Sequence, residues 1–188
     1  MDTSYYVVRY SGPFGFIKPW TAVRDRLTFS QQFLTPSILE GMRQKLEVSA
    51  ILRHRLRYLA INEQQEQTQP LGWEVKSKQR MMLRPRSILK RGVMICPSLF
   101  LAFGTPEDAS KAAEQHLCLC RNEDVILPDG NVQEMTAKAF DLIPGFELLL
   151  ERGPDSFLVG YNRFNNAEEM YGRLLIIGDP TSDEEYEP

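Results

Sequence analysis

Two Thr-Pro pairs divide a chain that otherwise has the residue pattern of strands. Thr35-Pro36 and Thr105-Pro106 each place a favourable N-cap residue before a proline at the first helical position. Apolar residues recur at helical spacing after each pair. Segments 5–10, 49–61 and 92–103 are rich in aromatic and β-branched residues and are predicted to be strands. This order predicts an α+β fold with two helices on one face of an antiparallel sheet, the ferredoxin-like βαββαβ plan that RNA recognition modules also use.

The rest of the chain is assigned by the same rules. We expect a polar loop at 62–70, a bend at Pro97, a turn at Asp129-Gly130, a short helix at 131–140, a hairpin of 146–150 with 157–161, and a closing strand at 173–177. Segment 73–91 is too polar to be core and is predicted to be an extended hairpin arm. The 188 residues then form one domain over 1–180, and the acidic tail 181–188 is expected to be disordered.

Charge is sorted along the chain. Residues 1–91 hold 16 basic and 7 acidic residues, a net charge of +9, whereas residues 92–188 hold 6 basic and 18 acidic residues, a net charge of −12. Such sorting indicates a half that binds a polyanion, joined to an acidic half that must avoid the polyanion or meet a basic partner. The alternative is a solvated basic surface with an ordinary acidic tail.

Three arginines alternate along the strand predicted at 49–61. Arg53, Arg55 and Arg57 are two residues apart, so one face of that strand would present three guanidiniums about 6.6 Å from one another. Like charges at this spacing repel and favour an anion between them. The sequence therefore predicts a polyanion-binding row, or else an exposed edge strand protected by its charges.

The strongest local signal is a basic run at 76–91, which holds seven basic residues and no acidic residue. Trp73, Met81 and Met82 lie beside or within it, so an arm with this sequence could hold a nucleic-acid backbone and stack a base. A solvated hairpin is the alternative. The candidate RNA-binding residues are Lys18, Arg24, Arg26, Arg53, Arg55, Arg57, Trp73, Lys76, Lys78, Arg80, Arg84, Arg86, Lys90 and Arg91.

Other classes of site find little support. Glycine-rich phosphate loops are absent from the sequence. His116, Cys118 and Cys120 could not converge on one metal ion from a continuous helix, and His116 is interpreted as a core residue. We therefore expect no metal and no cofactor. The sequence has no apolar stretch of about 18 residues and no secretory signal, and its three cysteines fit a reduced, cytoplasmic protein.

Four short motifs resemble those of a known family and occur in the same order along the chain. They are FGFIKP at 14–19, FLTPSILEGM at 33–42, KQRMMLRPR at 78–86 and MYGRLL at 170–175. Together they resemble the aromatic/Pro segment, the Thr-Pro-Ser helix start, the Gln-Arg-x-x-x-Leu-Arg segment and the closing segment of the CRISPR-associated protein 5 family. The resemblance covers most of the chain.

This resemblance implies a RAMP fold, in which a ferredoxin-like core carries a basic hairpin thumb, here 73–91. It also implies a subunit of a type I surveillance complex (Cascade) that grips the 5′ handle of the guide RNA (crRNA). Its partners would be that RNA, the neighbouring backbone subunit and the large subunit at the foot of the complex. The acidic half would then be a docking surface for protein subunits.

One branch of the family, the type I-C kind, which this chain resembles most, cleaves its own precursor RNA with a Tyr and a Lys-His pair. This chain departs from that pattern, because residues 45–48 contain no Tyr and Lys111 is followed by Ala112. The sequence therefore favours a non-catalytic RNA-binding subunit. Two alternatives stay open: a metal-independent endoribonuclease using His54, Tyr58 or Lys111, and an interaction protein that imitates such a subunit and inhibits the complex.

Overall fold

A computed structural model describes residues 3–19, 27–70, 72–76, 81–84, 86–162 and 166–182. Strands dominate it, and three helices lie among the described residues. The elements are β1 (Ser4–Ser11), β2 (Phe14–Gly15), β3 (Leu27–Phe29), α1 (Pro36–Leu46), β4 (Arg53–Arg57), β5 (Ala60–Pro70), β6 (Glu74–Lys76), β7 (Met81–Leu83), β8 (Arg86–Ile95), β9 (Ser98–Phe103), α2 (Pro106–Ala113), β10 (Leu117–Cys118), β11 (Val125–Thr136), α3 (Ala137–Asp141), β12 (Gly145–Leu149), β13 (Phe157–Asn162) and β14 (Glu168–Ile177).

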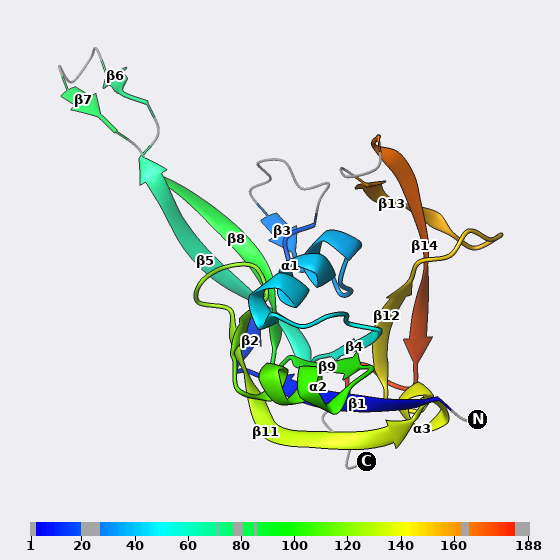
Figure 1. Ribbon diagram of the computed structural model, residues 1–188. Helices are drawn as coiled ribbons and strands as arrows, with labels where there is room; N and C mark the ends of the chain where they lie inside the picture. Colours follow the sequence, from blue (N-terminus) through cyan, green and yellow to red (C-terminus); the bar gives the residue numbers. More distant parts are fainter. Residues whose placement is uncertain are drawn as a thin grey trace.

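The body of the molecule is an eight-stranded sheet in the order β10-β11-β1-β9-β4-β12-β14-β13 (Figure 1). Its central strands β11, β1, β9 and β4 pair antiparallel. Both helices expected at the Thr-Pro pairs are confirmed, and Thr105 accepts a bond from the backbone N–H of Asp108 as an N-cap. The α+β class expected from the sequence is therefore confirmed.

The two faces of this sheet are covered differently. Val8, Tyr10 and Leu101 point into a large core that includes Met42 of α1 and Ala109 of α2. On the opposite face, Val7, Phe100 and Ala102 pack with Phe140 of α3 in a smaller cluster. Successive side chains of a strand point to opposite faces of the sheet. Arg53, Arg55 and Arg57 of β4 therefore lie on the same face as α3.

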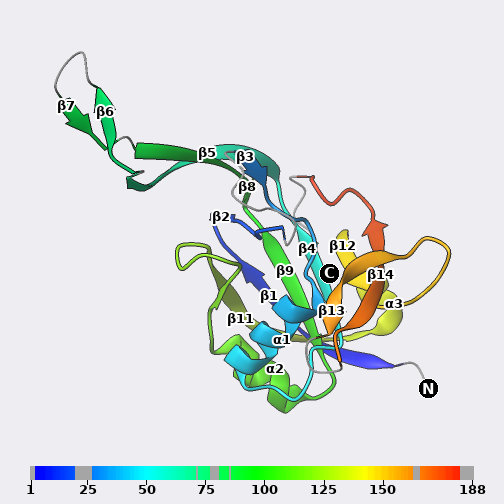
Figure 2. The same ribbon diagram turned by 90° about the horizontal axis from the view of Figure 1, so that it is seen from above.

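A second sheet branches from the first and extends into an arm, defined here as residues 60–95. Strands β5 and β8 form its long antiparallel hairpin, and β6 pairs with β7 near its end. Figures 1 and 2 show the arm reaching well away from the body. The polar loop expected at 62–70 is wrong: this segment is strand β5, because β8 supplies its backbone partners. The arm is therefore longer than the predicted 73–91.

The sequence was misread most in the acidic half. Segment 131–140 is mainly the end of β11 rather than a helix, and α3 takes only its last residues. Gly130, at φ +77°, lies inside β11 instead of closing a turn. Strand β12 pairs with β14 and β4, and β13 pairs with β14, so the expected hairpin of 146–150 with 157–161 is wrong. The expected bend near Pro97 is confirmed between β8 and β9.

Among the described helices, none is long and apolar enough to cross a bilayer. The disordered tail expected at 181–188 falls, from residue 183 onward, outside the described residues. The single-domain assignment over 1–180 stays a prediction.

Candidate nucleic-acid interface

The end of the arm presents an exposed face of mixed apolar and cationic character. Val75 and Met82 are directly opposite each other in the β6–β7 pair, and they are 69% and 62% exposed. Trp73, 64% exposed, lies two residues before Val75, and the guanidinium carbon of Arg84 lies 6.0 Å from its ring centroid. An exposed aromatic ring beside a guanidinium offers both stacking and charge to a nucleic acid.

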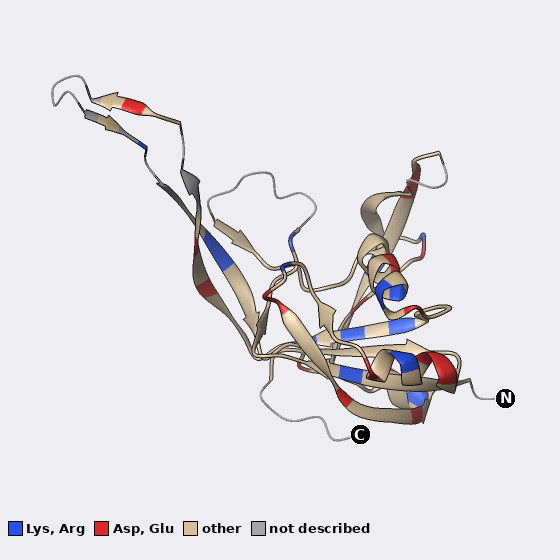
Figure 3. Ribbon diagram, turned by 60° about the vertical axis from the view of Figure 1, so that its left-hand side comes forward, with Lys and Arg blue, Asp and Glu red and all other residues tan. Residues whose placement is uncertain are grey.

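Nearer the body, cations of the arm are paired with acidic residues of the facing strand. Lys90 lies 3.0 Å from Glu63, and Arg91 lies 3.3 Å from Glu66, in both cases between β8 and β5. Figure 3 shows that the arm carries both basic and acidic positions. These two cations of the basic run are therefore partnered within the hairpin.

The other arm and N-terminal candidates can be placed only in part. Lys18 is exposed just after β2. Lys76 and Arg86 belong to strands β6 and β8. Arg24, Arg26, Lys78 and Arg80 lie outside the described residues.

The expectation of an exposed row at Arg53, Arg55 and Arg57 is wrong. Strand β4 is internal, between β9 and β12, so the alternative of a charged edge strand is wrong as well. Arg55 is 0% exposed and Arg57 is 7% exposed. Arg57 donates to the backbone oxygen of Ser182 at 2.9 Å. Arg55 reaches no solvent in this fold and cannot contact RNA from this position.

A buried carboxylate of the neighbouring strand explains this arrangement. Glu147 on β12, 1% exposed, accepts bonds from Arg53 Nε at 2.6 Å and Nη2 at 2.8 Å. Arg55 Nη2 lies 3.3 Å from the same carboxylate. Asp141 at the end of α3 accepts a further bond from Arg53 at 3.0 Å. We call Arg53, Arg55, Glu147 and Asp141 the β4–β12 ion cluster.

Phe140 covers this cluster from α3. Its ring centroid lies 5.1 Å from the guanidinium carbon of Arg53 and 5.5 Å from that of Arg55. Within the described part of the chain, none of the three guanidinium nitrogens of Arg55 has a hydrogen-bond partner. Bonds to Glu147 raise the pKa of Arg53, whereas burial lowers the pKa of Arg55. The cluster is thus a neutral, internal link between strands and not a surface for anions.

The residues considered for RNA cleavage do not form a catalytic group. His54 is 3% exposed, and its Nε2 accepts a bond from the backbone N–H of Leu148 at 3.3 Å. Tyr58 is buried and accepts a bond from Gln32 at 2.6 Å, while Lys111 donates to the backbone oxygen of Glu47. No hydrogen bond among the described residues joins these three side chains. Burial also lowers the pKa of His54 to about 4, which makes it a weak base.

His54 gives the protein an expected pH dependence of stability. Its pKa falls from 6.5 to about 4 in the fold, so the unfolded chain binds a proton that the native state excludes. The stabilisation is complete above the unfolded pKa and is lost as the pH falls toward the folded pKa, by about 3 kcal/mol in all. Urea unfolding of the wild type and His54→Gln at about pH 7 and about pH 4 measures it, because glutamine keeps an acceptor for Leu148. Equal losses in both proteins would contradict the assignment.

The structure also places residues that sequence reasoning used differently or missed. His116, expected in the core, is exposed. Glu147 and Asp141 were not singled out, although a lone acid in the apolar run 145–150 is itself a signal for a buried partner. Among the described residues, no group of three His, Cys, Asp or Glu could hold a metal ion. A hollow of about 300 Å³ lies beside β13 and β14 and is lined by Leu150, Glu151, Arg152, Asn162, Glu168, Glu169, Met170 and Tyr171.

Comparison with known proteins adds information on the fold. No family model matches the chain, and no curated protein matches it by sequence. Among solved structures, a chain of a CRISPR RNA-guided surveillance complex has a similar fold, with a TM-score of 0.53 and 12% identity. The match covers 94% of this chain and 91% of that one. A crystal structure of a Cas protein is 16% identical over 96% of this chain and 98% of that chain, with a TM-score of 0.46.

Proposed function

We propose that this chain is an RNA-binding subunit of a CRISPR RNA-guided surveillance complex, and that its arm grips the 5′ handle of the guide RNA. The observation that carries the proposal is the arm itself: a long hairpin whose end exposes Trp73, Val75, Met82 and Arg84. A soluble body gains nothing in stability from such a projection, since these side chains bury little surface against it. A binding surface is the usual reason for an exposed apolar face rimmed by cations.

The topology of the body supports the same proposal. We interpret β1, α1, β4, β9, α2 and β11 as the ferredoxin-like core expected from the sequence. In the observed order β11-β1-β9-β4, the fourth strand lies beside the first and the third lies between the first and second, as that plan requires. The likeness to a chain of a surveillance complex extends over nearly the whole length of both chains. Three of the four sequence motifs that resemble CRISPR-associated protein 5, at 14–19, 33–42 and 170–175, lie wholly among the described residues of this fold.

In this proposal the arm makes two kinds of contact with RNA, one with phosphates and one with a base. Cations of the basic run meet the phosphates, which adds sequence-independent affinity. A base stacks on Trp73, whose ring is held beside Arg84. Strands β12, β13 and β14 lie away from the arm in Figure 1, and we assign this side of the body to the neighbouring protein subunits of the complex.

Fluorescence anisotropy with a short labelled single-stranded RNA tests the proposal. We expect binding whose logarithmic salt slope is about −3 if four or five phosphates are neutralised, since each contributes about 0.7. A double-stranded DNA of equal length is the control for non-specific polyanion binding. Affinity that is absent, or independent of salt, would contradict the proposal.

The same RNA, incubated with the protein in chelator and examined on a denaturing gel, separates binding from cleavage. We expect it to remain intact, because the native fold buries His54. Specific cleavage that disappears in His54→Gln would instead support the endoribonuclease alternative. Pull-down of complex subunits after nuclease treatment distinguishes RNA-dependent assembly from imitation of a subunit.

A further inference from the structure

Two arginines from different parts of the chain pack against one buried aromatic ring where the arm leaves the body. Phe16, just after β2, is 2% exposed. Arg91 comes from β8 of the arm, and Arg121 comes from the loop between β10 and β11 of the body. The guanidinium carbon of each lies 5.5 Å from the Phe16 ring centroid. Partly desolvated contacts of this kind each contribute about 1 kcal/mol.

The body holds its arginine firmly. Arg121 donates to Asp124 from Nε at 2.9 Å and from Nη2 at 2.6 Å, and Asp124 is 0% exposed. One backbone bond closes the loop, with the Asp124 N–H donating to the Arg121 oxygen at 3.0 Å, and the Arg121 N–H donates to the Asp124 carboxylate at 3.0 Å. A bidentate, buried pair fixes the orientation of a guanidinium plane more strictly than a single contact does.

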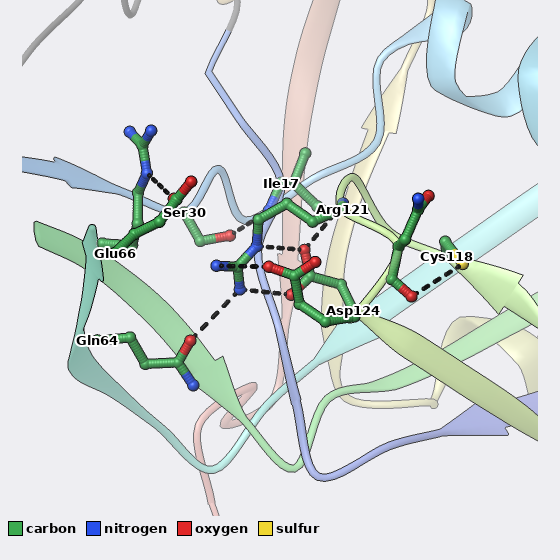
Figure 4. A network of polar contacts seen from close by, with 10 residues as sticks. Ile17, Ser30, Gln64, Glu66, Cys118, Arg121 and Asp124 are labelled. Atoms are coloured by element: carbon green, nitrogen blue, oxygen red, sulfur yellow. Dashed lines mark hydrogen bonds and ion pairs between the residues drawn. The ribbon is translucent and has the colours of Figure 1, made fainter. Parts of the chain in front are cut away.

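From this fixed position Arg121 also reaches the other strand of the arm. Its Nη2 lies 3.4 Å from Oε1 of Gln64 on β5 (Figure 4). Arg91 is in turn tied to Glu66 of β5 at 3.3 Å. The side chains of one body loop and one buried ring therefore contact both long strands of the arm.

Two chain connections join the arm to the body at the same junction. The arm joins the body where β4 runs into β5 and where β8 turns into β9. The second of these connections passes through Cys96, a non-glycine residue at φ +48°. Strand β8 also pairs with β2 and β3 at the base of the arm, whereas β5 pairs with β8 alone among the described strands. The contact of Arg121 with Gln64 therefore adds a link from the body to the β5 side of the hairpin.

We propose that Arg121, with Phe16, Asp124 and Arg91, forms a brace that sets the direction of the arm. Arg121 is thus a positioning residue that acts on RNA through the arm and does not touch it. The proposal rests on the proposed function only for its consequence in RNA binding. If the brace holds the arm in the binding direction, a loosened brace leaves only a fraction of the molecules correctly oriented. The apparent affinity falls in proportion to that fraction, so it falls about five-fold when one molecule in five is correctly oriented.

Distance measurement between two spin labels tests the brace without RNA. The labels are placed at Ile88→Cys, 54% exposed on β8, and at Ser110→Cys, exposed on α2, with the three native cysteines replaced by serine. We expect one narrow distance distribution in the parent and a broader one in Arg121→Lys, which keeps the charge and a partner for Asp124 but loses the planar stack. Arg91→Gln, which leaves the Arg121–Asp124 pair intact, should broaden it as well.

Arg43→Gln is the control for loss of an arginine ion pair elsewhere in the fold, because Arg43 pairs with Glu40 within α1 and not with the arm. Unchanged distributions in both Arg121→Lys and Arg91→Gln would overturn the brace, whether or not RNA binds. In the anisotropy assay, Arg121→Lys should lose about five-fold in affinity with an unchanged salt slope, because no phosphate contact is removed. A wild type that fails to bind RNA would defeat the proposed function and leave the distance result to decide the brace.

Discussion

Replacement of Glu147 by alanine is expected to destabilise the protein by about 3–5 kcal/mol. The carboxylate is 1% exposed and is the nearest acidic partner of both Arg53 and Arg55. Its removal takes away the nearest counter-charge of the fully buried Arg55 guanidinium, and none of the Arg55 nitrogens has a hydrogen bond in the described structure to compensate. Urea unfolding followed by circular dichroism measures the loss at neutral pH. For a domain of this size such a loss is a large fraction of the total stability.

Two companion variants separate charge from packing. Asp141→Ala removes a partner of Arg53 that is more than half exposed, and we expect at most about 1 kcal/mol of destabilisation. Arg55→Met replaces the buried cation by an apolar side chain of similar length, and we expect a neutral or stabilising effect, since Glu147 keeps Arg53. A Glu147→Ala variant no less stable than Asp141→Ala would contradict this account of the β4–β12 ion cluster.

The cluster also explains why the arginine row was misread. Spacing alone showed correctly that Arg53, Arg55 and Arg57 share one face of a strand. It could not show that β12, about ninety residues later, would lie beside β4 and bring Glu147 to that face. Long-range pairing decides whether a charged strand is an edge or is internal, and local sequence carries little information about it.

The elements with local signals were predicted well, and those that depend on a partner strand were not. Thr-Pro pairs and helical periodicity identified α1 and α2, because helix caps and amphipathic faces depend on residues that are close together in the sequence. Segment 62–70 has the composition of a loop, yet it is strand β5 because β8 pairs with it along its length. The arm was recognised from its charge, whereas the junction contacts of Arg121 with Phe16 and Gln64 join segments far apart in sequence.

Ion pairs within the fold join the basic half of the chain to the acidic half. Some cations of the basic half are neutralised by the acidic half within the fold: Arg53 meets Glu147 and Asp141, and Arg9 lies 3.4 Å from Asp129. The net charge of +9 over residues 1–91 therefore overstates the charge that RNA can meet. The basic run at 76–91 holds seven basic residues and no acidic residue, so under the proposed function the arm is the place where substitutions should have the largest effect.

Exchange of Trp73 for alanine together with Arg84 for glutamate is expected to weaken RNA binding at least 100-fold. Loss of base stacking on the exposed ring accounts for about 1–3 kcal/mol. Reversal of Arg84 removes one phosphate contact and adds repulsion, so the salt slope should fall by about 0.7. Both side chains are exposed at the end of the arm, so the free energy of unfolding should stay within about 0.5 kcal/mol of the wild type. Anisotropy with the labelled single-stranded RNA, over a range of salt concentrations, measures both affinity and slope.

The body of the protein offers a matched control for this variant. Tyr161 on β13 is 50% exposed, and Arg152, also exposed, lies over the ring of Tyr171, so Tyr161→Ala with Arg152→Glu removes the same kinds of group far from the arm. We expect this control to bind RNA with wild-type affinity and slope, because the residual attraction of one distant charge is screened within about 10 Å at ordinary salt. Equal losses in the two variants would show that net charge and not the arm governs binding. Wild-type affinity in the Trp73→Ala, Arg84→Glu variant would exclude the end of the arm as the site where RNA is held.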